Sequence, residues 1–367
     1  MDIFMRCWAR SRGHMRKKIL IIKGENIMID KAKIGVLGAG TWGIALARLL
    51  CNAGHDVTVW SAIESEIDTL SSTRMHPNLP GIELPEDMKY TKDIAKACAG
   101  MDLVLFAVPS VFVRATAKRA SQYIADGQII VDVAKGIEKE TLFTMTEIIA
   151  DEVKNPTVKL VTLSGPTHAE EVIKDLPTTI ISACEDLETA EVVQKIFNTE
   201  RMRVYTNEDI RGVELCGALK NVLALASGIA TGLGCGDNAR AALITRGIAE
   251  LSRLGIAMGC DEHTFIGLAG IGDIIVTATS IHSRNNRCGM LIGQGVAVED
   301  AIKQVGMVVE GLNALPAAVA LAKKYNVEMP IFETVDAVVT GRVDVSTAVD
   351  RLMSRELKAE ADSTDRN

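Results

Sequence analysis

Two lysines and an arginine suggest most of the chemistry in this sequence. Lys220 interrupts a nearly all-apolar stretch, and apolar surroundings lower the pKa of a lysine toward neutrality, as proton transfer requires. The same lysine could instead extend to the surface or pair with Glu214. Lys135 follows a strand-like run beside a glycine, where a ligand contact competes with the role of a solvated loop lysine. Arg284 lies in a polar, basic loop at 281–287; its rigid fork could bind phosphate, or it could contact nothing.

A glycine-rich turn indicates a second kind of site, one for a dinucleotide. Gly38, Gly40 and Gly43 are spaced Gly-x-Gly-x-x-Gly between an apolar run at 33–37 and an amphipathic segment from 41 to about 53. The first glycine allows the tight turn, the second lets the backbone approach a pyrophosphate, and the third lets the helix pack on the strand. The helix directs unpaired N–H groups and the positive end of its dipole at that phosphate. A purely structural turn is the alternative.

The elements around these residues predict an α/β fold with a doubly wound parallel sheet. Apolar runs at 56–60, 102–110, 128–134 and 158–163 alternate with helical segments, and ligands of such sheets bind at the carboxyl ends of the strands. Three of these ends carry polar residues, at 109–112, 135–138 and 164–170. The segment 164–167 offers hydroxyls and N–H groups to polar substrate atoms, whereas we interpret His168 as structural or peripheral.

Beyond Asn207 the pattern changes to helices. The stretch 210–232 is almost entirely apolar and rich in small residues. Glu214, Lys220 and Asn221 interrupt it, so it does not suit a membrane span. We therefore predict a central helix buried between two domains.

Composition excludes several classes of function. The 367 residues carry a net charge of −7, which argues against nucleic acid as a partner. The eight cysteines and six histidines show no spacing that suits a metal, and we expect none to be bound. Residues 1–30 are basic, but their apolar run is too short for a signal peptide. We interpret them as a disordered extension; an organellar transit peptide is the alternative.

Eight motifs follow one another along the chain: Gly-Ala-Gly-Thr-Trp-Gly at 38–43, Ala-Lys-Gly-Ile-Glu at 134–138, Ser-Gly-Pro-Thr-His-Ala-Glu-Glu at 164–171, Gly-Val-Glu-Leu-Cys-Gly-Ala-Leu-Lys-Asn-Val at 212–222, Asp-Asn-Ala-Arg-Ala-Ala-Leu-Ile-Thr-Arg-Gly at 237–247, Gly-Ile-Gly-Asp at 270–273, Ser-Arg-Asn at 283–285 and Val-Val-Glu-Gly at 308–311. In this order they resemble the bacterial-type NAD(P)-dependent glycerol-3-phosphate dehydrogenases over about 33–357. The resemblance implies a Rossmann-type domain at 31–207, an all-α domain of the 6-phosphogluconate-dehydrogenase-like kind at 208–358, and a polar tail at 359–367.

The resemblance also implies a reaction: reversible hydride transfer between NAD(P)H and dihydroxyacetone phosphate, giving sn-glycerol 3-phosphate for phospholipid synthesis in the cytoplasm. Lys220 would donate and accept the proton, while Lys135 and Asp273 would orient the hydroxyl and tune that lysine. The implied coenzyme contacts are Gly38, Gly40, Thr41, Trp42, Gly43, Phe112, Lys135, Ala169, Arg284, Val308 and Glu310. The implied substrate contacts are Lys135, Gly165, Thr167, Lys220, Asp273, Ser283, Arg284 and Asn285, with Arg284 and Asn285 on the phosphate.

One position departs from the family pattern. The family commonly has Trp-x-Arg at the end of the second strand, where the arginine suits the 2′-phosphate of NADP, but this chain reads Trp60-Ser61-Ala62. An acidic residue there would favour NAD, and none stands at 60–62. We therefore expect use of both coenzymes, with a weakened preference for NADPH.

Two rival functions remain open from the sequence. A related two-domain reductase, of the β-hydroxyacid dehydrogenase or ketopantoate reductase type, would share the glycine motif and a lysine in the second domain. Ser-Arg-Asn at 283–285 argues against it. A non-catalytic nucleotide-binding protein would bind NADH and be indifferent to Lys220→Ala. The resemblance further implies a homodimer, although no dimer interface can be identified from the sequence.

Overall fold

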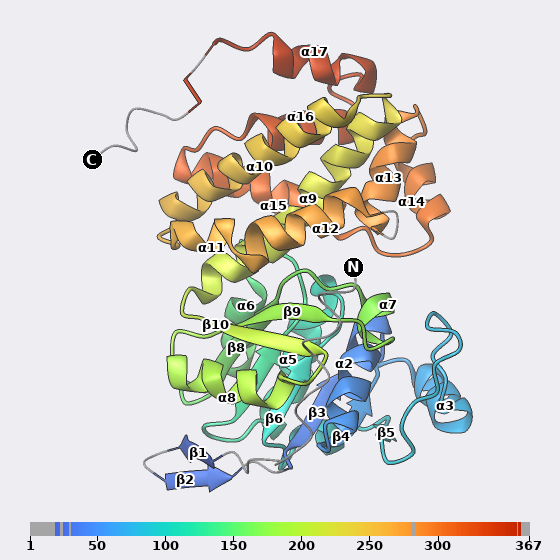
Figure 1. Ribbon diagram of the computed structural model, residues 1–367, viewed down its shortest axis with the longest axis vertical. Coiled ribbons are helices and arrows are strands. Elements are labelled where there is room, and N and C mark those ends of the chain that lie inside the picture. Colours follow the sequence, from blue (N-terminus) through green and yellow to red (C-terminus); the bar gives the residue numbers. More distant parts are fainter. Residues whose placement is uncertain (1–18, 23–24, 29–30, 281–282, 358, 361–367) are drawn as a thin grey trace, which may run out of the picture.

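The computed structural model describes residues 19–22, 25–28, 31–280, 283–357 and 359–360. A sheet covered by helices forms the N-terminal part, and helices alone form the C-terminal part, which lies beyond one end of the strands (Figure 1). Within the segment 1–30, the strands β1 (Ile19–Ile22) and β2 (Glu25–Met28) pair antiparallel. The rest of that segment lies outside the described residues.

The main sheet has eight strands in the order β10-β9-β8-β7-β6-β3-β4-β5. All neighbours pair in parallel except β8 and β9, which are antiparallel. The predicted doubly wound, mostly parallel sheet is confirmed; the one antiparallel pair arises because the short helix between β8 and β9 does not carry the chain back to the opposite end of the sheet. The strands are β3 (Lys33–Leu37), β4 (Asp56–Trp60), β5 (Lys89–Thr91), β6 (Leu103–Phe106), β7 (Ile129–Asp132), β8 (Lys159–Ser164), β9 (Thr178–Ala183) and β10 (Met202–Asn207).

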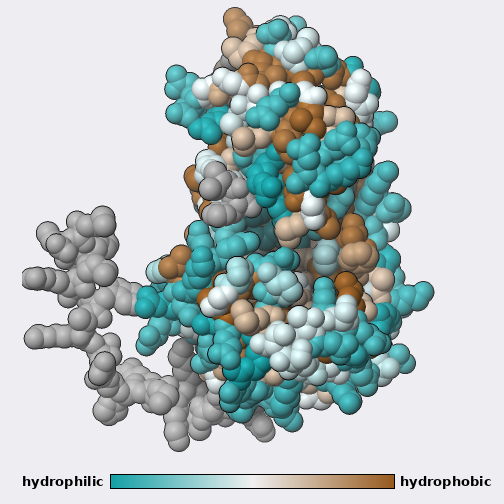
Figure 2. Space-filling model, turned by 90° about the vertical axis from the view of Figure 1, so that its right-hand side faces the viewer, coloured by the Kyte–Doolittle hydropathy of each residue, from teal (hydrophilic) through white to brown (hydrophobic). Residues whose placement is uncertain are grey.

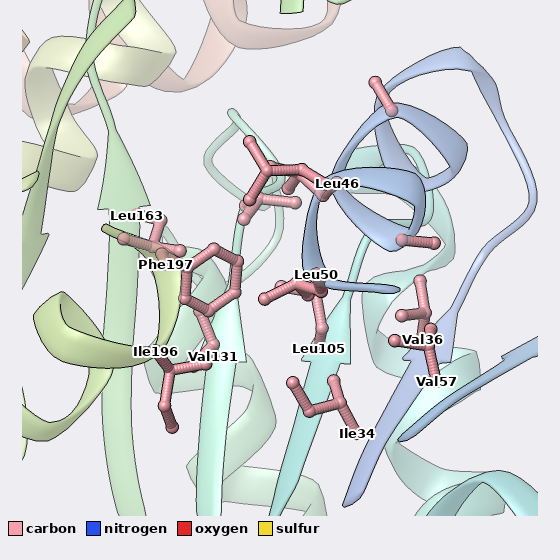
Figure 3. Packing of buried hydrophobic residues seen from close by; sticks show 14 of the residues in the cluster. Ile34, Val36, Leu46, Leu50, Val57, Leu105, Val131, Leu163, Ile196 and Phe197 are labelled. Carbon is pink, nitrogen blue, oxygen red and sulfur yellow. The ribbon is translucent and has the colours of Figure 1, made fainter. Parts of the chain in front are cut away.

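Helices cover both faces of this sheet. On one face, Leu46 and Leu50 of the first long helix pack toward Leu105, Val131 and Phe197 (Figure 3). On the other face, Phe106 and Ile130 pack with apolar residues of three further helices. The central strands β3, β4, β6 and β7 are buried on both faces, which explains their continuous apolar runs. The helices of this part are α2 (Thr41–Asn52), α3 (Glu64–Thr73), α4 (Ile94–Cys98), α5 (Val113–Ala120), α6 (Met145–Val153), α7 (Ala169–Val172) and α8 (Leu187–Phe197), with 3-10 turns η1 (Ser110–Phe112) and η2 (Ser121–Tyr123).

The C-terminal part is built around α9 (Ile210–Gly232), whose bounds match the predicted central helix. By length and composition α9 could cross a membrane, but its whole apolar window is buried inside the protein, as in the core helix of a soluble protein. The elements around it are α10 (Asp237–Ala257), α11 (Glu262–Ile266), the π-helical turn η3 (Leu268–Gly272), α12 (Asp273–Thr279), α13 (Arg284–Gly293), α14 (Val298–Val305), α15 (Glu310–Tyr325), α16 (Pro330–Val339), η4 (Val345–Thr347) and α17 (Ala348–Met353).

Glycines bring α9 and α13 into close contact. A Cβ atom on Gly228 would lie 2.1 Å from Asn286 O, and one on Gly289 would lie 2.1 Å from Leu225 O. Such distances leave no room for a side chain, so the two backbones touch. This crossing fixes the start of α13, at Arg284, relative to α9.

Candidate active site

Lys220 lies in the middle of α9 with 5% of its surface exposed. Its Nζ donates to Asp273 Oδ1, and to Thr277 Oγ1 at 2.9 Å. Neither open alternative holds, because the side chain does not reach the surface and does not pair with Glu214. That glutamate instead accepts hydrogen bonds from the backbone N and the Oγ1 of Thr146.

Asp273 joins Lys220 to Lys135. Its carboxylate is completely buried at the start of α12. Lys135 Nζ donates to Asp273 Oδ2 at 2.8 Å and to Gly165 O at 3.3 Å. One carboxylate thus bridges two ammonium groups that come from the β7 end and from α9, and the structure brings the three residues predicted as catalytic together.

The electrostatics of Lys220 suit proton transfer. Burial lowers its pKa from the ordinary value to about 7; the Asp273 charge opposes this change and the nearby Lys135 charge adds to it. At neutral pH the side chain therefore populates both the amine and the ammonium form. A group in that condition can act as base in one direction and as acid in the other.

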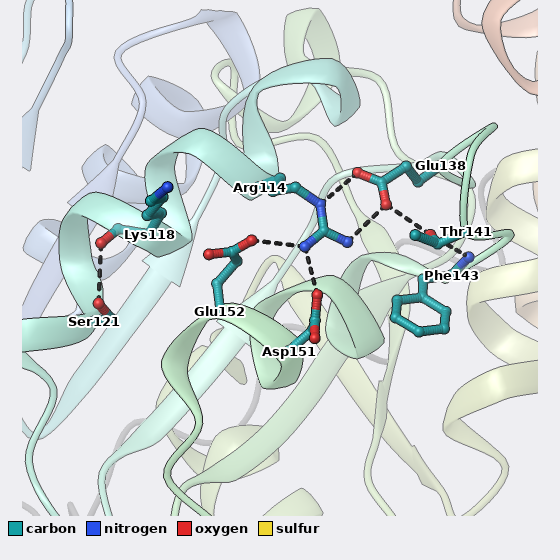
Figure 4. Close-up of polar contacts among 8 residues, drawn as sticks. All are labelled: Arg114, Lys118, Ser121, Glu138, Thr141, Phe143, Asp151 and Glu152. Atoms are coloured by element: carbon teal, nitrogen blue, oxygen red, sulfur yellow. Dashed lines mark hydrogen bonds and ion pairs between the residues drawn. The ribbon is translucent and has the colours of Figure 1, made fainter.

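A charged cluster fixes the loop that carries Lys135. Glu138 accepts two hydrogen bonds from Arg114 of α5, at 2.6 and 2.7 Å, and this arginine also binds Asp151 and Glu152 of α6 (Figure 4). Arg114 thereby lowers the pKa of Glu138. Sequence reasoning missed Arg114, although the predicted motif at 134–138 contains its main partner.

The predicted phosphate-binding residues lie at the N-terminus of α13. Ser283 caps the helix through Asn286 N, at 3.2 Å, and Arg284 is its half-buried first residue. The predicted loop at 281–287 is therefore wrong from Arg284 onward, because the Ser283 cap starts a helix there. Backbone N–H groups at such a terminus favour phosphate.

Asn285 makes contacts that the sequence does not reveal. Its Nδ2 donates to Asn221 Oδ1 at 2.9 Å, and its Oδ1 accepts from Gly311 N at 2.8 Å. The buried amide thus links α13 both to the residue after Lys220 and to the first turn of α15. Sequence reasoning missed Asn221 and Thr277; the spacing of Thr277, one helical turn after Asp273, was an available signal.

The glycine-rich turn fits a dinucleotide. Gly38 has a φ of +123°, and a Cβ on it would lie 2.7 Å from the backbone of Ala107. A Cβ on Gly43 would lie 2.3 Å from Gly38 O, whereas one on Gly40 would meet nothing within 4 Å. The first and third glycines are therefore required by packing. The second opens onto free space at the N-terminus of α2, where a pyrophosphate can approach the N–H groups.

The other predicted coenzyme residues surround the same end of the sheet. Phe112, in η1, and Val308, before α15, are exposed, at 55% and 39%. Glu310, at the start of α15, accepts hydrogen bonds from the Ser110 hydroxyl at 2.7 Å and from the Ser110 N at 3.4 Å. This pair joins the helical part to the sheet part. Figure 2 shows the side of the molecule on which α3 and α7 lie, where two lobes meet at a narrower waist.

The remaining predicted residues lie at the starts of α2 and α7 and directly after β8. Thr41 and Trp42 start α2, and the Trp42 ring packs against the sheet core. Ala169 is buried in that same core. Gly165, with a φ of +148°, follows β8, and Thr167 Oγ1 donates to its carbonyl at 3.2 Å.

Comparisons with known proteins agree with this geometry. The family model described as the N-terminus of NAD-dependent glycerol-3-phosphate dehydrogenase matches residues 33–190, and the C-terminus model of the same family matches 209–350. A relative from Lactobacillus delbrueckii subsp. bulgaricus, named glycerol-3-phosphate dehydrogenase [NAD(P)+] 2, is 64% identical over 333 residues, which are 90% of this chain and 99% of that protein.

Solved structures are similar too. The glycerol-3-phosphate dehydrogenase of Coxiella burnetii has a TM-score of 0.84 and 36% identity, covering 89% of this chain and 99% of that one. A ketopantoate reductase from Ralstonia eutropha JMP134 has a TM-score of 0.57 and 16% identity over 87% of this chain and 99% of that one, a likeness of fold alone. This chain belongs to the NAD-dependent glycerol-3-phosphate dehydrogenase family.

Proposed function

We propose that this protein transfers a hydride reversibly between NAD(P)H and dihydroxyacetone phosphate, giving sn-glycerol 3-phosphate. The observation that carries the proposal is the buried Lys220, whose pKa is about 7 and whose ammonium is held by Asp273. Family membership and the glycine turn support the coenzyme, and the α13 N-terminus supports a phosphorylated substrate. A non-catalytic nucleotide-binding protein would not need a lysine with a pKa near neutrality.

The residues divide the work between proton transfer and positioning. In alcohol oxidation, neutral Lys220 takes the proton of the C2 hydroxyl; in ketone reduction, its ammonium returns that proton. The coenzyme, when bound, accepts or supplies the hydride. Lys135 and Asp273 hold Lys220 and orient the reacting oxygen, to which Lys135 can donate a hydrogen bond. Asp273 also offsets the positive charge that the ammonium brings into a buried site.

The phosphate subsite would supply binding energy that orients the reacting carbon. Ser283, Arg284 and Asn285 would hold the phosphate with the helix N-terminus behind them, while Gly165 and Thr167 would line the substrate from the β8 end. Thr41, Trp42, Phe112, Ala169, Val308 and Glu310 would contact the coenzyme together with Gly38, Gly40 and Gly43; for Ala169 this contact would use the backbone.

We further propose the biological setting that the family suggests. The enzyme would act in the cytoplasm, as a homodimer with domains at 31–207 and 208–358, and would supply glycerol 3-phosphate to phospholipid synthesis. The absence of an arginine at Ala62 supports use of both coenzymes, with a weakened preference for NADPH. A preference for NADPH above about a hundredfold in kcat/KM would contradict that expectation.

The reaction is tested by following oxidation of NADH and NADPH with dihydroxyacetone phosphate, using dihydroxyacetone as the control. We expect turnover with the phosphorylated ketone alone. Equal turnover of both ketones would contradict the phosphate subsite. No turnover, in a folded protein that binds both coenzymes, would favour a related reductase or a binding protein.

Arg284→Ala tests the phosphate subsite in the same assay. We expect KM for dihydroxyacetone phosphate to rise by about tenfold or more, because a bidentate contact is lost, while kcat changes less. Arg284→Lys should recover only part of the loss, since lysine lacks the fork. Arg287→Ala, on an exposed side chain of the same helix, is the matched control. An equal effect of both alanine variants would disprove the role of Arg284.

A further inference from the structure

Glu66 lies beside the end of β4, although it belongs to α3. Ser61 Oγ donates to Glu66 Oε2 at 2.6 Å and accepts from Ile63 N at 3.0 Å. Ser61 is buried and Glu66 is half-buried. One hydroxyl therefore fixes the turn from β4 into α3 and holds the carboxylate back against the strand end.

The same carboxylate lies near the glycine-rich turn. His76 Nε2 is 3.1 Å from the carbonyl oxygen of Ala39, which stands between Gly38 and Gly40. Burial lowers the pKa of His76, while its hydrogen bond with the Ala39 carbonyl and the charge of Glu66 oppose that change. The hydrogen bond from Ser61 places Glu66 at the β4 end, which adjoins the glycine-rich turn because Gly38 N donates to Trp60 O at 2.8 Å.

That location has a defined role in dinucleotide-binding folds. The adenosine ribose lies beside the end of the second strand of the first βαβ unit, where an acidic residue binds the ribose hydroxyls of NAD and an arginine accommodates the 2′-phosphate of NADP. The strand end itself, Trp60-Ser61-Ala62, carries neither residue. The acidic side chain of Glu66, four residues after Ala62, lies at this strand end instead.

Two cations near this end of the sheet make other contacts. Lys92 Nζ binds Asp68 at 2.8 Å and Glu64 at 3.4 Å. The Arg119 guanidinium stacks over the Trp60 ring, 4.9 Å from its centroid. A 2′-phosphate bound at this end of the sheet would be repelled by the Glu66 carboxylate.

We propose that Glu66, held in place by Ser61, discriminates between the two coenzymes: its carboxylate accepts a hydrogen bond from the adenosine ribose hydroxyls and repels a 2′-phosphate. The inference rests on the proposed function, because it assigns a determinant within that coenzyme site. Ser61 acts only through Glu66 and is a positioning residue.

Binding without turnover tests the assignment. Dissociation constants of NADH and NADPH, and of ADP-ribose and its 2′-phosphate, are measured by titration calorimetry in the absence of the ketone. Glu66→Gln should improve NADPH relative to NADH by about tenfold, because it removes a charge at close range and keeps the shape. Ser61→Ala should shift the ratio in the same direction by about threefold, because it frees the carboxylate.

Glu64→Gln is the matched control, since Glu64 is an exposed acid of the same helix turn. The ratio of its NADPH and NADH dissociation constants should stay within about twofold of the wild-type ratio. The assignment would be overturned if the ratio of the NADPH and NADH dissociation constants of Glu66→Gln stayed within about twofold of wild type, or if Glu64→Gln changed that ratio equally. Either result would leave coenzyme use intact. If the wild-type protein binds neither nucleotide, the proposed function fails together with the assignment.

Discussion

Lys220 is an ionisable side chain in a buried site, where the charged form is unfavourable. Burial lowers its pKa to about 7, and its two charged neighbours act in opposite directions, Asp273 raising the pKa and Lys135 lowering it. The first neighbour makes protonation easier and the second makes it harder. Because one carboxylate touches both ammonium groups, the operating pH of the site depends on the balance between them.

The balance can be tested by removing each neighbour. Oxidation needs neutral Lys220, so kcat/KM for glycerol 3-phosphate should rise with pH through about 7; reduction needs the ammonium and should fall over the same range. Lys135→Met should move the apparent pKa upward, and Asp273→Asn should move it downward, each by about one pH unit. The measurement is the pH profile of each variant, with exposed Lys139→Met as control. Shifts in the same direction would contradict the account.

At the scale of elements, α9 and α13 hold the proton-transfer and phosphate groups together through backbone contact. Gly289→Ala would place a methyl group 2.1 Å from Leu225 O. We expect the free energy of unfolding to fall by about 2 kcal/mol and KM for dihydroxyacetone phosphate to rise, because Arg284 moves with α13. A Cβ on Gly236 would meet nothing within 4 Å, but Gly236 is the N-cap of α10, so Gly236→Ala should lower the free energy of unfolding by no more than about 1 kcal/mol. Denaturant titration distinguishes these outcomes; equal losses would show that the helix contact is not the cause.

Elements were predictable where their signals are local. The run 210–232 coincides with α9, and the apolar runs at 56–60 and 128–134 contain β4 and β7, because burial on both faces leaves an unbroken apolar pattern. The reversal of β9 and the start of α13 at Arg284 were not predicted, since the first depends on the path between strands and the second on a single cap. The Lys220–Asp273 contact spans 53 positions, and spacing alone carries no signal for such a pair.

At the scale of the whole molecule, the buried side chain of Glu214 connects α9 to the sheet part. Glu214 is held by Thr146 of α6, and burial raises its pKa to about 7. The folded state therefore binds the proton more tightly than the unfolded state. This contribution to stability is fully present below about pH 4.5 and is lost as the pH rises toward about 7.

Glu214→Gln should remove that dependence. Over the window from about pH 4.5 to 7, the wild-type free energy of unfolding should fall relative to the variant by up to about 3 kcal/mol. Denaturant titrations at several pH values measure the difference. Glu208→Gln, at an exposed residue that lines the same 490 Å³ pocket beside α6 as Glu214 does, should run parallel to wild type. A difference between wild type and Glu214→Gln that stays constant with pH would contradict a titrating Glu214.

The Ser110–Glu310 pair connects the two parts on the coenzyme side, across 200 positions of sequence. If it sets the geometry of Glu310 for the coenzyme, Ser110→Ala should raise KM for the coenzyme by about fivefold with kcat little changed. Glu310→Ala should raise KM for the coenzyme further. The double variant should raise KM no more than Glu310→Ala alone, because Ser110 then has no carboxylate to position. Ser121→Ala, a change on the exposed surface of the sheet part, is the control. Additive losses would mean that the two residues act independently and that Ser110 does not position Glu310.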